Sequence, residues 1–215
     1  MNVTIIGTGK MARAISTRLL EGGNEVNLIG HTPGKAEALA GELKAMDKGG
    51  SISAAASNTL PGEVVILAVP YEAAIPALYQ YMSQLPGMIV VDITNPIDYH
   101  KMQPSTPSAS SSAEEIARVM PVNTPVVKAF NTTFAATLMN GKVNNMPLDV
   151  FIAGDDAQAK AKVSQMIQSG GMNAVDVGPL VMSRQLEAMG LLHTAIQSPH
   201  NLGYKSAIKI ISSMQ

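Results

Sequence analysis

The sequence has no cysteine and no tryptophan among its 215 residues, and each absence excludes some functions. Without cysteine the chain cannot form a disulfide bond, a thiolate nucleophile or a cysteine-based metal site. The lack of disulfides is typical of a cytoplasmic protein, so we expect a cytoplasmic location. Aromatic residues make up only 4%, which leaves little to stack on nucleic-acid bases.

An excess of charge of one sign and long apolar runs are also missing. The formal net charge is −1, so no overall field favours nucleic acid or anionic lipid. Apolar runs such as residues 64–69 are too short to span a bilayer. The amino terminus enters a strand pattern at once, without a basic segment and a long apolar stretch. We expect neither nucleic acid nor a membrane as partner, and we interpret the chain as full length.

Hydrophobic residues at 46% and charged residues at 14% predict a well-buried core. Hydrophobic periodicity predicts strands at residues 3–6, 25–29, 51–54, 63–69, 88–93, 126–130, 149–153 and 174–177. It predicts helices at residues 11–21, 35–44, 71–85, 158–168 and, interrupted near Pro199, 183–213. Alternating strands and helices indicate an α/β fold: a Rossmann-like doubly wound, mostly parallel sheet with flanking helices. We predict a single domain over residues 1–215, with a C-terminal helical segment at 183–215.

Residues 103–112 are rich in serine and proline, and we expect a surface loop there. A capping box follows it, formed by Ser111 with Glu114 or by Ser112 with Glu115. The capping box predicts a helix that continues through Met120.

A glycine-rich turn lies between the first predicted strand and helix. The segment reads Gly7, Thr8, Gly9, Lys10, Met11 and Ala12, which matches the pattern G-x-G-x-x-G/A. Gly7 permits the sharp turn, Gly9 lets the backbone approach a pyrophosphate, and Ala12 permits close packing of helix and strand. Because free N–H groups at the helix start face an anion, the context predicts a dinucleotide site rather than a simple tight turn.

The end of the second strand distinguishes NADP from NAD. An acidic residue there would bind the ribose 2′-hydroxyl, whereas basic residues suit a 2′-phosphate. Residues 29–35 contain no acid, while His31 and Thr32 can donate hydrogen bonds and Lys35 adds positive charge. We therefore predict NADP(H), with NAD(H) as the alternative.

The chain also resembles a known family. The similarity begins at the glycine turn through Arg13 and continues over residues 33–37, 67–70, 92–96, 127–132, 177–180 and 184–187. With these segments in order, the chain resembles the F420-dependent NADP reductases and the cytosolic NADP-binding domain of the STEAP ferric reductases. Two positions differ: His31-Thr32 replaces the usual Ser-Arg, and Ile6 stands where deazaflavin-dependent members tend to have glycine.

The resemblance implies a pocket at the carboxyl ends of the strands. It places Val69-Pro70 and Asn95-Pro96 beside the nicotinamide and its ribose, and the adjoining Ala68 and Thr94 belong to the same segments. It places Ala129, Phe130 and Asn131 on the reacting face. Binding at strand ends is also what the doubly wound fold predicts.

Few residues indicate acid–base chemistry. The four histidines lack metal-ligand spacing, so we predict no metal site. Asn131 is our polar pocket candidate, with a turn-capping amide as the alternative. Lys128 could reach a substrate or cofactor oxygen, or it could form an ion pair at the domain surface. We assign no catalytic residue, because in hydride transfer the cofactors carry the reactivity.

These observations predict an NADP(H)-dependent oxidoreductase that transfers hydride between nicotinamide and a flavin or F420 (deazaflavin) acceptor. Two alternatives remain: a reductase of a small imine or carbonyl compound, and a non-catalytic NADP(H)-binding redox sensor. The expected partner is a small-molecule acceptor. Apolar residues near the C-terminus, such as Ile196 and Ile208, would suit either a core or a homodimer contact.

Overall fold

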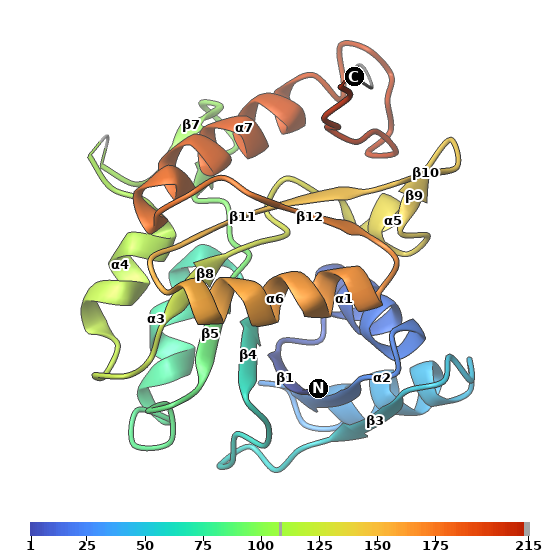
Figure 1. The fold of residues 1–215 in the computed structure, drawn as a ribbon, viewed down its shortest axis with the longest axis vertical. Helices are drawn as coiled ribbons and strands as arrows, with labels where there is room; N and C mark the ends of the chain where they lie inside the picture. The colour runs from blue at the N-terminus through green and yellow to red at the C-terminus, as the bar shows by residue number, and fades with distance from the viewer. Residues whose placement is uncertain (108, 213–215) are drawn as a thin grey trace.

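The computed structural model describes residues 1–107 and 109–212, and an eight-stranded sheet runs through it (Figure 1). In the spatial order β3-β2-β1-β4-β5-β8-β11-β12, the strands are Ser51–Ala54, Glu25–Ile29, Asn2–Ile6, Val64–Leu67, Ile89–Asp92, Val126–Lys128, Asp149–Gly154 and Asn173–Asp176. The pairing of β8 with β11 is antiparallel, and the other neighbouring pairs are parallel. The order of the first six strands is that of a Rossmann fold, which confirms the predicted fold class.

The central strands are buried on both faces, as their continuous apolar sequences require. In β4, Val64 and Ile66 belong to one core cluster, whereas Val65 and Leu67 belong to the cluster on the opposite face. Successive side chains of a strand point to opposite faces, so such a strand must be covered on both sides. Each fully buried aliphatic side chain contributes roughly 1.5–3 kcal/mol to folding.

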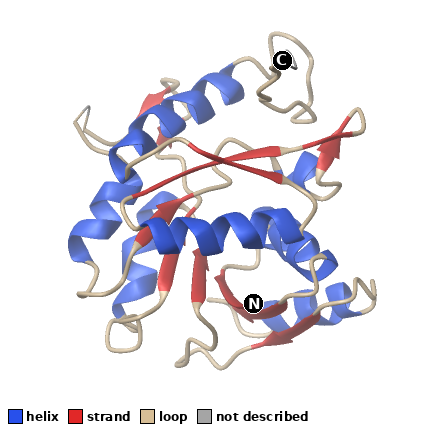
Figure 2. Cartoon of the chain, viewed as in Figure 1, coloured by secondary structure: helices blue, strands red, loops and turns tan. Residues whose placement is uncertain are grey.

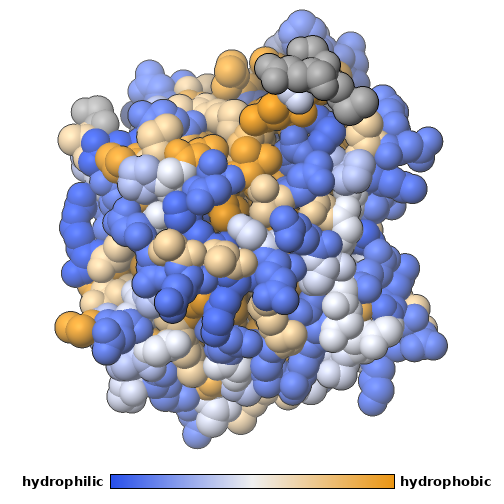
Figure 3. Space-filling model, in the orientation of Figure 1, coloured by the Kyte–Doolittle hydropathy of each residue, from blue (hydrophilic) through white to orange (hydrophobic). Residues whose placement is uncertain are grey.

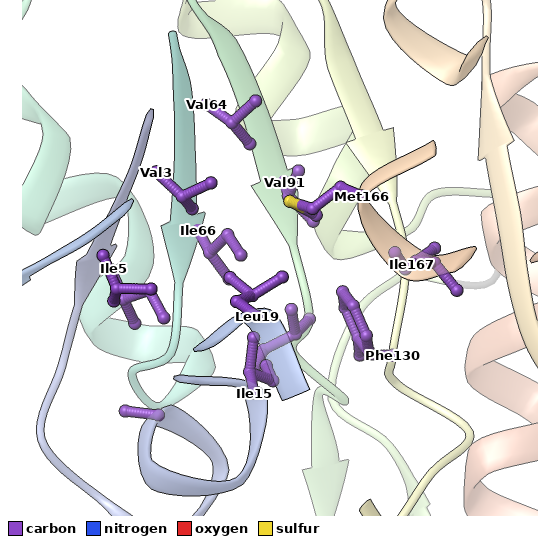
Figure 4. Packing of buried hydrophobic residues seen from close by; sticks show 14 of the residues in the cluster. Val3, Ile5, Ile15, Leu19, Val64, Ile66, Val91, Phe130, Met166 and Ile167 are labelled. Carbon is purple, nitrogen blue, oxygen red and sulfur yellow. The ribbon is translucent and has the colours of Figure 1, made fainter. Parts of the chain in front are cut away.

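Helices cover both faces of this sheet (Figure 2). The residues of α1 (Lys10–Glu21), α2 (Lys35–Lys44) and α6 (Ala157–Ser169) pack in one cluster, and those of α3 (Tyr71–Tyr79) and α4 (Ser112–Val119) in the other. In the first cluster, Ile15 and Leu19 of α1 and Met166 of α6 gather against the strands (Figure 4). Among the described residues, no helix has the length and apolarity needed to span a membrane.

Ser111 caps α4 as predicted, although Glu114 binds the Ser111 hydroxyl and not the backbone N–H that completes a capping box. The Ser111 side chain accepts a hydrogen bond from the Glu114 backbone N–H at 3.2 Å and donates one to Glu114 Oε2 at 2.9 Å. The pair is thus Ser111 with Glu114 rather than Ser112 with Glu115. This cap places Ser112 at the first position of α4.

Two predicted helices are shorter than the sequence indicated. α3 ends at Tyr79 instead of residue 85, and Pro76 lies inside it without a backbone N–H to donate. α7 spans Ser183–Ala195, and residues 196–212 form turns and irregular chain instead of helix. Asp149 holds this last segment, because it accepts hydrogen bonds from Lys209 Nζ at 2.5 Å and from the Ile210 backbone N–H at 2.8 Å. Residues 213–215 lie outside the described residues.

Several short elements were not predicted. In the serine- and proline-rich stretch, β7 (Gln103–Pro104) pairs with β6 (Ile97–Asp98), and Ser108 lies outside the described residues. The segment between β8 and β11 holds a short helix, α5 (Ala135–Leu138), and a hairpin of β9 (Lys142–Val143) and β10 (Met146–Pro147). Strands of two residues and a helix of a single turn carry too little periodicity to be recognised in a sequence.

Candidate active site

The predicted site residues follow five parallel strands at the points where these end. Gly7, Gly30, Ala68, Ile93 and Ala129 are the first residues after β1, β2, β4, β5 and β8. Because these strands are parallel, all five points lie at one edge of the sheet. The strand order reverses between β1 and β4, and in open α/β sheets a ligand binds in the crevice at such a reversal.

Gly7 makes the sharp turn after β1 in a conformation that only glycine adopts readily. Its φ is +127°, and its N–H donates to the Ile29 carbonyl at 2.8 Å. A Cβ atom at this position would overlap the backbone carbonyl of Ala68. The turn is therefore seated directly against the end of β4.

Gly9 leaves the start of α1 open to a ligand. It is the N-cap residue, no side chain caps the helix, and no acidic residue lies in the first turn. A Cβ atom on Gly9 would have no neighbour within 4 Å. Open space beside free N–H groups at a helix start suits a pyrophosphate, so the turn fits a dinucleotide.

The other residues of this turn surround the open helix start. Ala12 is fully buried against the sheet, Thr8 and Met11 are half-buried, and Lys10 is exposed. The loop after β2 packs on the turn, since a Cβ on Gly30 would lie 3.2 Å from Thr8 Cγ2. His31 and Thr32 of this loop and Lys35, the first residue of α2, are exposed, and the loop itself contains no acid. These side chains are available to a 2′-phosphate, and their contact with a nucleotide stays a prediction.

The ends of β5 and β8 are joined by a pair of asparagine side chains. Asn131 Nδ2 donates to Asn95 Oδ1 at 2.9 Å, and Asn95 Nδ2 donates to the Asn131 carbonyl at 2.6 Å. Asn131 Nδ2 also donates to the Leu186 carbonyl of α7 at 2.8 Å. Thr94 and Pro96 beside this pair are buried, Ala68 and Val69 are half-buried, and Pro70 is exposed. The amide pair thus connects the two strand ends with α7.

The structure corrects the expected position of Phe130. Its side chain is fully buried in the core cluster, together with Ala129, instead of facing a pocket (Figure 4). The Phe130 backbone has a φ of +59°, which is unusual for a bulky residue. This conformation turns the chain at the end of β8, so that Phe130 supports the site from inside the core.

Lys128 lies neither in a pocket nor at the domain surface, the two positions considered from the sequence. It is fully buried, and its Nζ lies 2.8 Å from Asp92 Oδ2 and 2.7 Å from Glu187 Oε1. It also donates to the Thr94 carbonyl at 2.6 Å and to Ser112 Oγ at 2.8 Å. Asp92, Ser112, Lys128 and Glu187, which we call the charged cluster, therefore join β5, β8, α4 and α7.

Sequence reasoning missed three members of the charged cluster. Asp92 and Glu187 lie in segments that carry the family resemblance, and Ser112 is one of the two predicted helix caps. A buried lysine requires acidic partners, which is the one signal that could have pointed to them. Nothing in the sequence says which of the 16 acidic residues those partners are.

Burial affects ionisable groups around α7. Burial raises the pKa of Glu187, and the nearby Asp92 carboxylate raises it further, although Lys128 acts in the opposite direction. Burial and a 2.6 Å hydrogen bond to Glu115 raise the pKa of Tyr71 to about 12. His193 of α7 is buried with contacts at both ring nitrogens, to the Thr132 carbonyl and to Ser206 Oγ. This arrangement is that of a packed histidine.

Strand order, the glycine turn and the open helix start together define a dinucleotide-binding Rossmann protein. Comparison with known proteins gives the particular family. Residues 2–96 match the family model described as NADP oxidoreductase, coenzyme F420-dependent. The chain is 30% identical to the F420-dependent NADP reductase of Methanocaldococcus jannaschii, over 96% of this chain and 95% of that protein. It therefore belongs to the F420-dependent NADP reductase family, whose members are NADP-dependent oxidoreductases.

Two further similarities agree with this assignment. A solved structure of a putative F420-dependent NADP reductase from Arthrobacter superimposes with a TM-score of 0.82 at 29% identity, over 99% of this chain and 100% of the other. The metalloreductase STEAP3 of Rattus norvegicus is 32% identical over 88% of this chain. The chain spans only 36% of the length of STEAP3, so the similarity concerns one part of that protein.

Proposed function

We propose that the protein transfers hydride between NADP(H) and a flavin- or deazaflavin-type ring. The observation that carries the proposal is the open start of α1 at the reversal of strand order, in a chain similar over nearly its whole length to a F420-dependent NADP reductase. Bound NADPH supplies the hydride, so the protein has to bind and orient two rings and to exclude water.

Different residues at the strand ends bind different parts of the cofactor. The turn from Gly7 to Ala12 binds the pyrophosphate through backbone N–H groups, and His31, Thr32 and Lys35 bind the 2′-phosphate. Segments 68–70 and 94–96 form the walls beside the nicotinamide, and the Asn95–Asn131 pair holds the wall after β5 in place. No acid–base pair is needed for the hydride itself.

The test combines binding and turnover. We would titrate the protein with NADPH and NADH while following nicotinamide fluorescence, and then add FMN, FAD or F420 to the bound complex. Tight NADPH binding and loss of the reduced-nicotinamide absorbance with one ring acceptor would support the proposal and identify the acceptor. Turnover of a cyclic imine alone would favour the imine reductase alternative. NADPH binding without any turnover would favour a redox sensor.

We include a homodimer in the proposal. Apolar side chains are exposed on and near α7, among them Leu192 at 63%, Ile196 at 36% and Val181 at 42%. Figure 3 shows hydrophobic surface gathered toward the end of the molecule that carries α7 and the C-terminal segment. Light scattering during size-exclusion chromatography would show a dimer mass, and a monomer mass at micromolar concentration would contradict this part of the proposal. The cytoplasmic location stays a prediction.

A further inference from the structure

The charged cluster contains more acceptor atoms than it has hydrogens to donate. Ser112 Oγ lies 2.5 Å from Asp92 Oδ2 and 2.7 Å from Glu187 Oε1, yet a hydroxyl has one hydrogen. The three hydrogens of Lys128 Nζ already face two carboxylate oxygens, the Thr94 carbonyl and Ser112 Oγ. Ser112 can donate its hydrogen to only one of these two carboxyl oxygens. The other carboxyl must therefore carry a hydrogen of its own, which it donates to Ser112 Oγ.

The charges of the cluster lead to the same conclusion. Asp92 and Lys128 are fully buried and Glu187 is 8% exposed. One ammonium beside two carboxylates leaves a net negative charge among buried side chains, which is costly. One added proton makes the cluster neutral. Asp92 accepts hydrogen bonds at both oxygens, from the Thr94 backbone N–H at 2.9 Å and from Lys128 Nζ at 2.8 Å, which favours its ionised form. The donors of the cluster reach Glu187 at Oε1 alone, and burial raises the pKa of Glu187, so we assign the proton to this carboxyl.

No second cation neutralises the cluster within the described part of the chain. On α7, Arg184 is bound to Glu114 of α4 at 2.6 and 2.8 Å. On α3, Tyr71 faces Glu115 of α4, and its raised pKa keeps it neutral. Glu72 of α3 adds a further negative charge near Tyr71. Among these groups the only cation, Arg184, is already paired with Glu114, so it does not offset the charge of the cluster.

The cluster also determines where α7 lies. Glu187 Oε1 accepts hydrogen bonds from the Ser112 backbone N–H at 3.0 Å and from Lys128, so it ties α7 to α4 and β8. Lys128 at the same time holds the Thr94 carbonyl in the segment after β5. An ionised Glu187 would accept these hydrogen bonds more strongly, but docking α7 would then bury a second negative charge beside Asp92. Burial of that charge opposes the attachment of α7 where the nicotinamide is expected.

We propose that the charged cluster binds one exchangeable proton, carried by Glu187, and that this proton holds α7 over the ends of β5 and β8 in the arrangement needed for hydride transfer. Glu187 and Lys128 are then positioning residues, which act through α7 and the Thr94 carbonyl. The inference rests on the proposed function for its effect on hydride transfer. The existence of the proton is independent of that function.

Infrared spectroscopy tests for the proton directly in the unmodified chain. Protein labelled with ¹³C at the glutamate side-chain carboxyl would show a protonated-carboxyl band at pH 7, shifted by the label, which disappears in Glu187→Gln. Exposed glutamates are ionised at that pH and do not contribute. Absence of a labelled band in the wild-type protein would overturn the proposal, as would a band that persists in Glu187→Gln.

The pH dependence of hydride transfer tests the positioning role. In rapid-mixing experiments the wild-type rate should fall about tenfold per pH unit above the pKa of the cluster, because the protonated form alone is competent. Glu187→Gln imitates the protonated state and should give a flat profile in this range, with an unchanged Kd for NADPH. A matched control, Glu63→Gln, changes an exposed carboxylate bound to Lys162 and should retain the wild-type profile.

The outcomes separate this inference from the proposed function. A wild-type profile that is already flat, or a Glu187→Gln profile that still falls, would overturn the positioning role. If no ring acceptor is reduced at all, the proposed function fails, while the infrared band still decides whether the cluster holds its proton.

Discussion

The site at the carboxyl ends of the strands has two halves, which are built in different ways. Around β1 and β2 the site consists of glycines and backbone N–H groups, with exposed polar side chains beside them. Around β5 and β8 it consists of buried side chains joined by hydrogen bonds and ion pairs. The first half is open for a ligand to complete, whereas the second half is already occupied by the protein's own groups.

The difference also lies in how far apart the contributing residues are in the sequence. Gly7 and Gly9 belong to one turn, so a short pattern describes them. Asp92, Ser112, Lys128 and Glu187 come from four separate elements, and only the fold brings them together. A site made of backbone tolerates changes in the surrounding side chains, whereas the charged cluster depends on every member. Three substitutions test this comparison, and a fourth tests the attachment of the C-terminal segment.

The largest expected effect is a loss of stability when the charged cluster around β5 and β8 is changed. Lys128→Met would remove the cation and leave the buried Asp92 carboxylate and Glu187 carboxyl without it, so we expect a loss of about 3–5 kcal/mol in the free energy of unfolding. Urea denaturation measures this. The control Lys162→Met removes an exposed lysine from its ion pair with Glu63 and should change stability by less than about 0.5 kcal/mol. Equal stability of the two variants would contradict our view of the cluster.

In the half around β1 and β2, Gly9→Ala should weaken NADPH binding without changing the stability of the fold. The Gly9 backbone, with φ −82° and ψ −171°, suits any residue, and the added methyl meets no protein atom within 4 Å. We expect the unfolding free energy to change by less than about 0.5 kcal/mol. NADPH binding, followed by fluorescence, should weaken at least about tenfold, or about 1.4 kcal/mol, because the methyl occupies the approach of the pyrophosphate.

Gly41→Ala is the matched control for that experiment. Gly41 is exposed within α2, and a Cβ there also has no neighbour within 4 Å. This change should stabilise the helix by about 0.5–1 kcal/mol and leave NADPH binding unchanged. Wild-type affinity in Gly9→Ala would show that the diphosphate does not approach this turn.

A smaller effect should distinguish the two nicotinamide cofactors. Lys35→Ala should weaken NADPH binding by roughly two- to fivefold, because an exposed ion pair contributes up to about 1 kcal/mol. NADH binding should not change, since NADH has no 2′-phosphate. Lys44→Ala at the other end of α2 serves as control. Equal weakening of both nucleotides by Lys35→Ala would place the 2′-phosphate elsewhere.

The smallest effect concerns the side chain that holds the C-terminal segment. Burial alone would raise the pKa of Asp149, but hydrogen bonds from Lys209, Asn173 and the Ile210 backbone outweigh it, and the pKa is lowered. Asp149 therefore stabilises the fold above the ordinary pKa of a carboxyl, and this contribution disappears as pH falls through the lowered pKa. Thermal unfolding should show a difference of about 1 kcal/mol or less between wild type and Asp149→Asn at pH 7, and no difference in strong acid. A difference that persists in acid would point to packing instead.

The comparison also explains what the sequence could predict. The bounds of β2, β3 and α2 agree with those read from periodicity, because each is determined by neighbouring residues. The irregular chain after α7 depends on tertiary contacts, such as that of Asp149 with Ile210, and was not predicted. The end of α3 at Tyr79 was not predicted either. The glycine turn was recognised as a motif, whereas Asp92 and Glu187 are 95 positions apart and no local pattern relates them.

The spatial order of the strands has a consequence for how the chain is made. From β1 outward, β2 and β3 are added on one side, and β4, β5, β8, β11 and β12 follow on the other, each at a free edge. No strand has to be inserted between two that are already paired. The sheet can therefore grow in step with synthesis, since chains emerge from the ribosome amino terminus first. Asp92 and Lys128 emerge before α7 and form a neutral pair, and Glu187 reaches them last.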